Sequence, residues 1–589
     1  MDDYIAGLNE EQRQAVAAKA EKPLLIVAGA GTGKTTTLTS RIARFIREGV
    51  PAGSILAATF TNKAAREMRE RLERMLPDTH LAGQSSAFIG TFHSLGARIL
   101  RENARFSGRT PGFVIYDSSD SFSVIKKIAK ELKLKSASQL AGCIGRRKRT
   151  GERCQHPGCE EGFARYQETL LNCDAADFDD LILLPVKMLG EQPHIRERYR
   201  ERFTHLFVDE YQDINAEQYE LLKLLASPNA SITAVGDDQQ TIYSWRGSDF
   251  SFFLEFEKNW MGAHIEMLTR NYRSGKNILG AANSIIRNNS RQIDKTLLPA
   301  REIPGDVTVH EYYGEDEEAE EVAGSIVKRI AAKERPSDIA ILYRTNAQSR
   351  PLEQALIERG VSYILWGGLA FYERREIKDI LAAVRAAHNP KDQTAIERLE
   401  KNLGKRRYFA VKSAITALNT PTPEAIINVF LKAADYLEMV QNIMTNPTER
   451  MENIAELQHF ASEFPDTGEF LERTALLQST DRTQRSGESI HMMTAHMAKG
   501  LEFNVVYVTG CAEGLMPHTM SLSSQDELEE ERRLMYVAAT RAKNSLNLSY
   551  VGTPSRFLLE MDPQYYSFIA HDGKTAELTD DEESYITLD

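Results

Sequence analysis

A glycine-rich segment at residues 28–35, AGAGTGKT, contains the residue types that hold the phosphates of a nucleotide. Backbone N–H groups in such a loop point at a phosphate, and a lysine after the last glycine neutralises the β- and γ-phosphates. In the general pattern G-x-x-x-x-G-K-[ST], the final hydroxyl is a ligand for Mg²⁺. This segment has alanine in place of the first glycine. The predicted phosphate loop consists of Ala28, Gly29, Ala30, Gly31, Thr32, Gly33, Lys34 and Thr35.

Carboxylates follow two apolar runs later in the chain. Asp209 and Glu210 come directly after HLFV, and a polar GDDQQ segment at 236–240 follows SITAV. In open α/β sheets, ligands bind outside the carboxyl ends of the strands. Beside a phosphate loop, one carboxylate at such a strand end holds Mg²⁺ and its neighbour is placed to take a proton from the attacking water. We therefore expect Asp209 to be a metal ligand and Glu210 to be a general base.

Two sets of strand-like apolar runs must position these residues. The first set contains the run at 24–27 and further runs that begin near 54, before 90, at 204 and at 231. The second set comprises 307–312, 338–344, 362–367, 489–496, 504–510 and 545–551. Residues from about 95 to 200 and from 376 to about 484 have a helical pattern without strand alternation. The sequence therefore predicts the α/β class, with two cores that are each interrupted by a helical insertion.

Composition limits the class of protein. The chain has 589 residues, of which 42% are hydrophobic and 26% charged, which is typical of a soluble globular protein of several domains. No apolar run approaches the ~18 residues of a membrane span, and the start, MDDYIAGLNEEQ, is acidic and polar. We therefore expect a cytoplasmic protein with no membrane partner. The net charge of −12 disfavours a polyanion partner, so nucleic-acid binding would depend on local basic patches.

Basic clusters and cysteines each allow two interpretations. RRKR at 146–149 and KRR at 405–407 are more typical of a solvated face than of a nucleic-acid site. Five cysteines in so long a chain do not make a disulfide framework and suit a reducing compartment. Four of them lie in the first insertion with a histidine, but their spacing is not that of a standard zinc finger. We expect scattered free thiols, with a zinc site as the alternative, at Cys143, Cys154, His156, Cys159 and Cys173.

Further motifs carry a family resemblance. They are DEYQD (209–213), GDDQQTIYSWRG (236–247), LTRNYRS (268–274), TAHMAKGLEF (494–503) and EEERRLMYVAATRA (529–542). With the phosphate loop, the chain resembles the superfamily 1A DNA helicases of the UvrD, Rep and PcrA family from residue 8 to about 560. The resemblance implies two RecA-like P-loop cores, each interrupted by a helical insertion subdomain. It also implies ATP and Mg²⁺ as cofactors.

The resemblance divides the chain into segments. They are core 1A with the ATP site at 1–91 and 200–270, insertion 1B at 92–199, core 2A at 271–375 and 485–562, insertion 2B at 376–484, and an acidic tail at 563–589. Insertion 2B is shorter than is usual in the family. Thr36 is included in the implied nucleotide-binding set, but it stands where these helicases often carry arginine, so one nucleotide contact is expected to be missing.

The resemblance also implies roles in ATP hydrolysis. Gln12 would read the adenine edge and Tyr272 would stack on the base, although Asn9 and Gln12 also fit a capping box at a helix start. Thr35 and Asp209 would hold Mg²⁺. Glu502 would reach the nucleotide from the second core, so that hydrolysis needs both cores closed on ATP. The residues implied in catalysis are Lys34, Glu210, Gln240, Arg273 and Arg541, with the two arginines as fingers on the γ-phosphate.

The same resemblance implies a track for single-stranded DNA. Taken alone, aromatic residues such as Phe60 and Trp245 would be core residues by default. Stacking of bases on aromatic side chains tolerates any sequence, which a translocating motor needs. The implied DNA contacts are Phe60, Asn62, Thr91, Phe92, His93, Trp245, Arg246, Arg344 and His496.

The predicted function is ATP-dependent 3′ to 5′ helicase and translocase activity on single-stranded DNA, in repair, replication or recombination. Its polarity follows from the family only. Partners would be single-stranded DNA and 3′-tailed duplex DNA, with an accessory protein or self-association for unwinding. Two alternatives stay open: a translocase that strips proteins from DNA or needs a partner to unwind, and an ATP-switched DNA-binding module.

Overall fold

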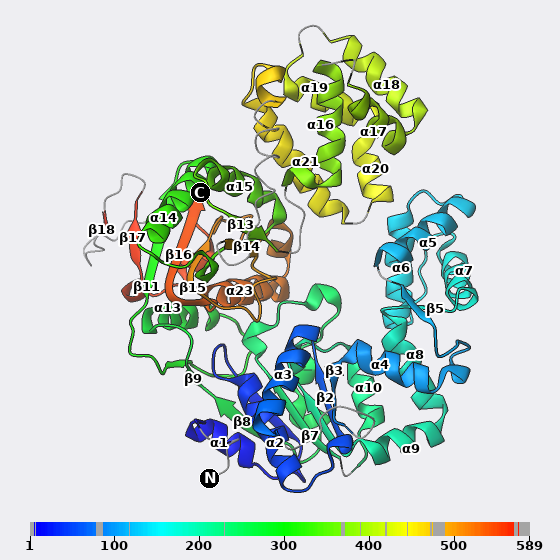
Figure 1. Cartoon of the computed structure of the whole chain (residues 1–589), viewed down its shortest axis with the longest axis vertical. Helices are drawn as coiled ribbons and strands as arrows, with labels where there is room; N and C mark the ends of the chain where they lie inside the picture. The colour runs from blue at the N-terminus through cyan, green and yellow to red at the C-terminus, as the bar shows by residue number, and fades with distance from the viewer. Residues whose placement is uncertain are drawn as a thin grey trace. The chain divides into compact units, whose positions relative to one another are not determined.

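The computed structural model describes residues 5, 7–77, 86–116, 118–228, 230–366, 371–388, 390, 392–418, 421–444, 446–471, 474, 489–570 and 575–576. The chain forms two compact units. Unit 1 is Met1–Tyr272 with Arg291–Ala300, and unit 2 is Arg273–Ser290 with Arg301–Asp589. Each unit contains a mainly parallel sheet covered by helices (Figure 1). In the described ranges, no helix is both long and apolar enough to cross a membrane.

The sheet of unit 1 has the order β3-β2-β6-β7-β1-β8, and every neighbouring pair is parallel. Its strands are β1 (Leu24–Ala28), β2 (Ile55–Thr59), β3 (Phe88–Thr91), β6 (His205–Val208), β7 (Ser231–Gly236) and β8 (His264–Leu268). All but β8 were expected from the sequence. β8 was not predicted, because it is an edge strand with partly exposed residues and lacks the continuous apolar run of the central strands.

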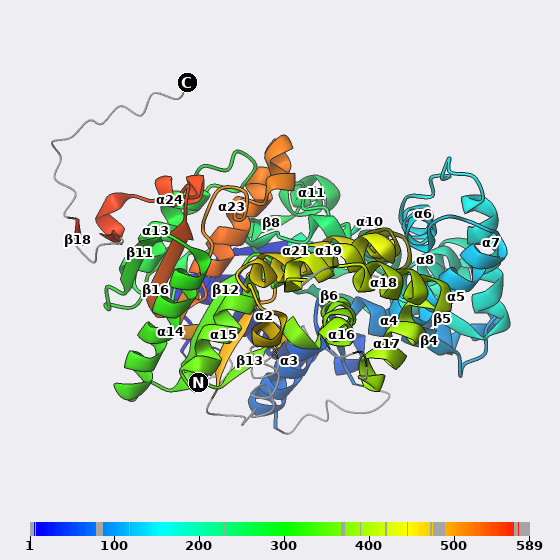
Figure 2. The same cartoon turned by 90° about the horizontal axis from the view of Figure 1, so that it is seen from above.

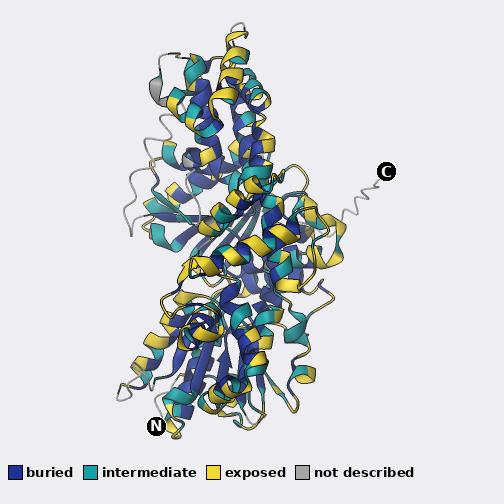
Figure 3. Cartoon of the chain, turned by 90° about the vertical axis from the view of Figure 1, so that its right-hand side faces the viewer, coloured by how far each residue is buried: buried dark blue, intermediate teal, exposed yellow. Residues whose placement is uncertain are grey.

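Alternate residues of the central strands face two separate cores. Leu25 and Val27 of β1 pack on one side of the sheet, and Leu24 and Ile26 pack on the other. On the second side lie α2 (Lys34–Arg47) and α3 (Asn62–Met75), and α1 (Glu10–Ala17) packs beside α2. On the first side lie α4 (Phe92–Glu102), α8 (Asp180–Glu191), α9 (Pro193–Arg202) and α10 (Ala216–Leu225). The strands are accordingly buried, while the helices have exposed faces (Figure 3).

Within the first insertion, three helices share a core of their own. They are α5 (Ser118–Glu131), α6 (Ala137–Thr150) and α7 (Cys159–Asn172), and they form one group in both views (Figures 1 and 2). Two short parallel strands, β4 (Val114–Tyr116) and β5 (Ala175–Asp177), flank them. The expectation of an insertion without strands is therefore wrong, because three-residue strands are too short to show alternation.

The sheet of unit 2 has the order β13-β14-β12-β15-β16-β11-β17-β18, parallel except for the β17–β18 pair. Its strands are β11 (Asp306–Tyr312), β12 (Ile339–Tyr343), β13 (Tyr363–Leu365), β14 (Ile490–Thr494), β15 (Phe503–Val508), β16 (Ala542–Val551), β17 (Ser567–Ile569) and β18 (Thr575–Ala576). The predicted second set is thus confirmed. β17 lies inside the segment expected to be a tail, because it extends the sheet beside β11.

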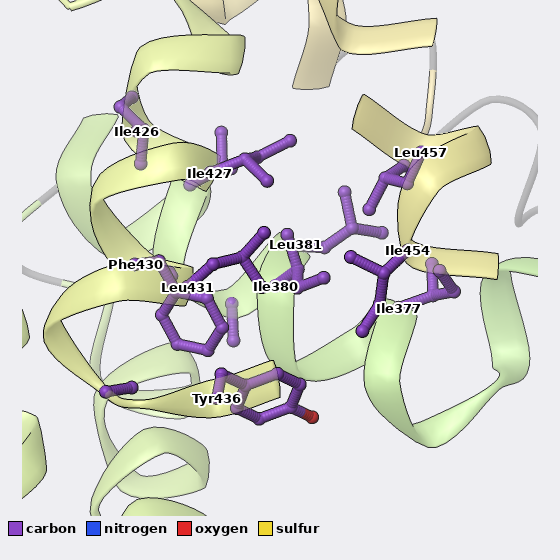
Figure 4. Close-up of a cluster of buried hydrophobic side chains, with 14 of the residues drawn as sticks. Ile377, Ile380, Leu381, Ile426, Ile427, Phe430, Leu431, Tyr436, Ile454 and Leu457 are labelled. Carbon is purple, nitrogen blue, oxygen red and sulfur yellow. The ribbon is translucent and has the colours of Figure 1, made fainter. Parts of the chain in front are cut away.

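The second helical insertion also has its own core. Its helices are α16 (Arg375–His388), α17 (Gln393–Leu403), α18 (Lys405–Thr416), α19 (Pro423–Ala433), α20 (Tyr436–Ile443) and α21 (Pro447–Ser462). Ile377 and Ile380 of α16, like Ile427 and Phe430 of α19, repeat at helical spacing and belong to this core. Ile377 lies beside Ile454 of α21 (Figure 4). The predicted fold class, two α/β cores with helical insertions, is confirmed, while the exact division into subdomains stays a prediction.

Candidate nucleotide-binding and nucleic-acid sites

The phosphate loop connects β1 to α2, as the sequence predicted. Gly31 and Gly33 have φ values of 65° and 86°, a left-handed conformation that glycine adopts without steric cost. A Cβ atom at Gly29 would lie 2.2 Å from Cδ2 of Leu297, so a larger residue there would displace the Leu297 side chain. Within the described residues, no side chain caps the N-terminus of α2. The first N–H groups of this helix are therefore suited to bind a phosphate.

A buried carboxylate holds the loop lysine in place. Lys34 Nζ donates to the carbonyl of Ala28 at 3.3 Å and lies 3.9 Å from Oδ2 of Asp237, the residue after β7. Asp237 also pairs with Nζ of Lys295 at 3.0 Å, and both of these side chains are fully buried. Burial raises the pKa of the Asp237 carboxyl, but Lys295 and Lys34 outweigh it and hold the pKa below its ordinary value. Asp237 is therefore an anion that positions Lys34.

Lys295 is a positioning residue that the sequence did not reveal. It lies in the polar segment RQIDK at 291–295, and its ammonium contacts Asp238 as well as Asp237. Removing one partner of a buried ion pair costs about 3–5 kcal/mol, because the other charge stays buried without compensation. Lys295 thus stabilises the anion that in turn contacts Lys34. A lysine among polar residues looks like a surface residue, so only its packing identifies this role.

The predicted metal ligand and general base follow β6. Asp209 is buried, and its N–H donates to the carbonyl of Ala58 at 2.9 Å. Glu210 has a φ of 52°, a conformation that costs a non-glycine residue about 1–3 kcal/mol and is concentrated at functional sites. Gln212 accepts from the N–H of Asp237 at 3.0 Å and donates to the Glu210 carboxylate. Gln212 therefore joins the end of β6 to the end of β7.

Strand order brings these groups to one edge of the sheet. β7 lies between β6 and β1, and all three strands are parallel, so the residues that follow them lie side by side. Gln240, in the turn after β7, donates from Nε2 to Oδ2 of Asp237 at 2.5 Å. This edge of unit 1 therefore gathers Lys34, Thr35, Asp209, Glu210 and Gln240.

The two residues implied in binding the base contact the phosphate loop. Gln12 forms the expected capping box with Asn9, accepting from its N–H at 2.9 Å, and its Nε2 donates to the carbonyl of Thr32 at 2.9 Å. The N–H of Tyr272 donates to the carbonyl of Gly31 at 2.9 Å, and its hydroxyl accepts from Nδ2 of Asn9 at 2.8 Å. The capping box is therefore confirmed, while recognition of the adenine edge by Gln12 stays a prediction.

Unit 2 contains the two arginines that are implied as fingers on the γ-phosphate. Arg273 Nε and Lys543 Nζ each lie 2.8 Å from a carboxylate oxygen of Glu502. Burial raises the pKa of Glu502, but Lys543 and Arg273 outweigh it and hold the pKa below its ordinary value. Arg541 is buried and donates to the hydroxyl of Thr540, whose carbonyl accepts from Arg273 at 3.3 Å. Lys543 was not predicted, although it lies only two residues beyond Arg541.

Among the implied DNA contacts, aromatic side chains of unit 1 are partly exposed. Trp245 is 64% exposed, which contradicts its default interpretation as a core residue. Phe60 stacks on Tyr243, with ring centroids 5.4 Å apart and an interplanar angle of 14°. Asn62 is exposed at the first residue of α3. These side chains follow β2 and β7, on which the phosphate-loop edge is also built.

Thr91 and Phe92, two of the implied DNA contacts where β3 ends, stabilise the fold. Thr91 caps α4 by accepting from the N–H of Ser94 at 3.1 Å. Phe92 is 3% exposed and packs in the core, so its ring is not presented to a ligand. His93 is half-buried and meets Phe178 edge-on at 5.8 Å. Burial lowers the pKa of His93, so its ring is neutral at neutral pH.

The remaining implied contacts differ in their surroundings. Arg344 makes a two-pronged ion pair with Glu531, with Nη2 at 2.8 Å and Nε at 3.1 Å. His496 is half-buried in the loop after β14. The side chain of Arg246 lies outside the described part of the structure. Arg344 would therefore have to exchange a carboxylate partner for a phosphate in order to bind DNA.

Two family models cover most of the chain. The UvrD/REP helicase N-terminal domain matches residues 8–261, and the UvrD-like helicase C-terminal domain matches 266–436 and 408–553. The chain belongs to the UvrD/Rep helicase family. The sites described above thus lie within the two domains that define this family.

Curated relatives agree with this assignment. The ATP-dependent DNA helicase PcrA of Bacillus subtilis is 38% identical, over 93% of this chain and 83% of its own length. PcrA of Leuconostoc citreum is 34% identical over 97% and 87%, respectively. A probable DNA helicase II homolog of Rickettsia felis is 35% identical over 95% and 96%. The similarity therefore extends over both units.

The sequence predicts that one nucleotide contact is missing at Thr36. In the structure, the hydroxyl of Thr36 accepts a hydrogen bond from Nη1 of Arg71 on α3. A guanidinium thus reaches the start of the phosphate-loop helix from a neighbouring element. Burial lowers the pKa of Arg71, which nevertheless stays protonated because an arginine pKa is so high. No sequence signal marks Arg71, because it lies 35 residues from Thr36.

Arg71→Ala is expected to weaken ATP binding by about 10- to 100-fold, because a hydrogen bond to a charged group is worth about 1.5–3 kcal/mol. Fluorescence titration with a labelled ATP analogue measures this change. Arg66→Ala is the matched control, since Arg66 lies on the same helix, is exposed and pairs only weakly with Glu70 at 3.9 Å. If Arg71→Ala and wild type bind the ATP analogue with equal affinity, Arg71 does not contribute to ATP binding at the Thr36 position.

Two further expectations from the sequence need correction. Lys148 of the first basic cluster is buried and pairs with Asp177 and Asp180 at 2.7 Å each, so it belongs to neither a solvated face nor a DNA site. The cysteines of the first insertion are not all scattered free thiols. Cys143 and Cys154 are joined as a disulfide, and Cys159 lies against them, whereas Cys173 is exposed and outside the group. The cluster 405–407 is solvated at its first two residues, as expected.

Proposed function

We propose that this chain is an ATP-dependent DNA helicase that moves 3′ to 5′ on single-stranded DNA. Membership of the UvrD/Rep family supports the helicase activity. The observation that carries the catalytic assignment is the loop lysine held by a buried, charged Asp237 beside the carboxylates that follow β6. Polarity is proposed from the family resemblance. We further propose a cytoplasmic enzyme that uses 3′-tailed duplexes, with self-association or an accessory protein for unwinding.

The residues of unit 1 fit ATP and Mg²⁺. Gly31 and Gly33 give the loop its left-handed turns, and the N-terminus of α2, which no described side chain caps, offers N–H donors. Thr35, in the first turn of α2, and Asp209, at the end of β6, would hold Mg²⁺. This ion supplies charge neutralisation at the phosphate oxygens when it is bound. A hydroxyl and a carboxylate are the oxygen ligands that Mg²⁺ prefers.

Each residue then has a role that its surroundings support. Lys34 neutralises the β- and γ-phosphates, and Asp237 keeps its ammonium beside the loop. Glu210 takes the proton of the attacking water, while Gln212 orients its carboxylate. Arg273 and Arg541 stabilise negative charge that develops on the transferred phosphoryl group. Glu502 holds Arg273 and Lys543 in position until the nucleotide is bound.

DNA binding is proposed to use the exposed aromatic side chains after β2 and β7. Trp245 offers most of its surface to solvent, and Phe60 is braced by the Tyr243 ring. Trp245 belongs to a segment that also carries a nucleotide-site residue, since Gln240 lies five residues before it. A base that stacks on Trp245 can therefore influence the γ-phosphate contact through a short stretch of chain.

Trp245→Ala is expected to weaken single-stranded DNA binding by roughly 5- to 150-fold, because base stacking on an aromatic is worth about 1–3 kcal/mol. The concentration of DNA that gives half-maximal stimulation of ATP hydrolysis should rise by the same factor. Met261→Ala is the control, since Met261 is an apolar residue of the same unit that is 93% exposed. Wild-type DNA stimulation in Trp245→Ala would remove this residue from the track. Absence of stimulation in the wild type would contradict the proposed function itself.

A further inference from the structure

Three cysteine sulfur atoms of the first insertion converge on one point. Cys143 lies in the middle of α6, Cys154 in the connection that follows, and Cys159 at the first residue of α7. Their Sγ atoms all lie within 4.8 Å of one another, and the Sγ atoms of Cys143 and Cys159 are 2.7 Å apart. Three separate segments thus direct a thiol to the same place.

Ordinary core packing does not explain this arrangement. Cys143 and Cys159 are buried among Leu140, Ile144 and other apolar residues, and Cys154 packs against this core. Small apolar side chains could fill that space, but non-bonded sulfur atoms do not pack at 2.7 Å. The disulfide between Cys143 and Cys154 uses two of the sulfur atoms and leaves the third against them. A single metal ion would account for all three.

Thiolate ligands select a soft or borderline cation, of which Zn²⁺ is the one that forms closed tetrahedral sites. At Zn–S distances of about 2.3 Å, thiolates around one ion lie about 3.8 Å apart. The Sγ atoms of Cys143 and Cys159, which are 2.7 Å apart, would therefore separate by about 1 Å to bind the ion. Cys159 is the first residue of a helix of 14 residues, so its thiol lies at the N-terminus of that helix. His156 lies in the turn before it, and its carbonyl accepts from the N–H of Cys159 at 3.2 Å.

We propose that the reduced protein binds one structural Zn²⁺ through Cys143, Cys154 and Cys159. His156, which is exposed, turns inward to complete a Cys₃His set. The three thiols lose their protons to solvent as the ion binds. The ion then ties the connection 151–158, which has no helix or strand, to both α6 and α7. Its role is to stabilise the insertion, and it takes no part in ATP hydrolysis.

The first test measures metal in the full-length chain purified with a non-chelating phosphine reductant. Elemental analysis should find one zinc per chain after dialysis. Replacement by Co²⁺ should give the thiolate charge-transfer and tetrahedral d–d absorption bands. Cys143→Ser, Cys154→Ser and Cys159→Ser should each lose these bands. Cys173→Ser and Cys511→Ser are the matched controls, because these two cysteines are outside the cluster and should leave the bands unchanged.

A second measurement keeps the proposal open to disproof if the serine variants fold poorly. Wild-type protein treated with a chelator should lose the zinc and melt at a lower temperature, and added Zn²⁺ should restore the melting temperature. His156→Ala should bind Co²⁺ at least tenfold more weakly, and unchanged affinity would remove His156 from the ligand set. The proposal is overturned if reduced wild type holds no zinc or cobalt, or if thiol titration finds only a Cys143–Cys154 disulfide.

Discussion

Lys34→Ala should reduce the kcat of ATP hydrolysis by about 10²–10³-fold or more, while binding of single-stranded DNA stays within about twofold of wild type. Lys34 is the only positive side chain that the phosphate loop itself supplies. Its loss leaves the phosphates without a neutralising ammonium. Asp237 keeps its ion pair with Lys295, so unit 1 should stay folded. Steady-state ATP hydrolysis and a DNA-binding titration measure the two quantities.

Lys258→Ala serves as the control for this change. Lys258 lies in the same unit, is 75% exposed and forms a surface ion pair with Glu255 at 3.0 Å. Surface pairs of this kind contribute little, so the control should hydrolyse ATP at the wild-type rate. Near-normal turnover in Lys34→Ala would refute the phosphate-loop assignment. Loss of DNA binding together with turnover would instead indicate that the substitution unfolds unit 1.

Arg273→Ala and Arg541→Ala should each lower kcat by about 10³–10⁵-fold, with a much smaller change in the affinity for ATP. An arginine finger acts on charge that develops in the transition state, so its removal affects turnover more than ground-state binding. Single-turnover hydrolysis and a labelled-nucleotide titration separate the two effects. Arg335→Ala is the control, because Arg335 is 77% exposed and forms a surface ion pair with Asp338.

The two variants differ in what else they disturb. Arg541 is buried and donates to the carbonyl groups of Val537 and Leu501, so its loss also leaves buried acceptors unpaired. A thermal melt must therefore accompany Arg541→Ala. Arg273 is less embedded, and its main partner Glu502 keeps Lys543. Equal losses in ATP binding and in turnover for Arg273→Ala would contradict the finger role.

Local pattern was sufficient to find the sheets. The strands β1, β2, β6, β7, β12 and β15 are continuous apolar runs because both faces of a parallel sheet are covered. Strands β4 and β5 have three residues each, and β8 and β17 lie near sheet edges, so none of them produces such a run. Burial on both faces is therefore what made a strand predictable here.

The nucleotide site was only partly predictable, for a related reason. Lys34 and Glu210 lie inside short motifs, so the residues next to them in the sequence indicate their roles. Lys295 and Arg71 act on the site from 58 and 35 residues away, and nothing around them in the sequence differs from a surface lysine or a surface helix. Their roles depend on tertiary packing, which brings a charge to a loop. The sequence grouped the cysteines of the first insertion, but it did not show that three of them converge, because these three come from separate elements.

The most direct test of the central claim is unwinding of duplex DNA that carries a single-stranded tail. Pure protein with ATP and Mg²⁺ should separate the strands of a 3′-tailed duplex and leave a 5′-tailed duplex intact, and Lys34→Ala should do neither. Strand separation only from the 5′ tail would contradict the proposed polarity. ATP hydrolysis that DNA does not stimulate, with no unwinding of either duplex, would contradict the helicase account as a whole.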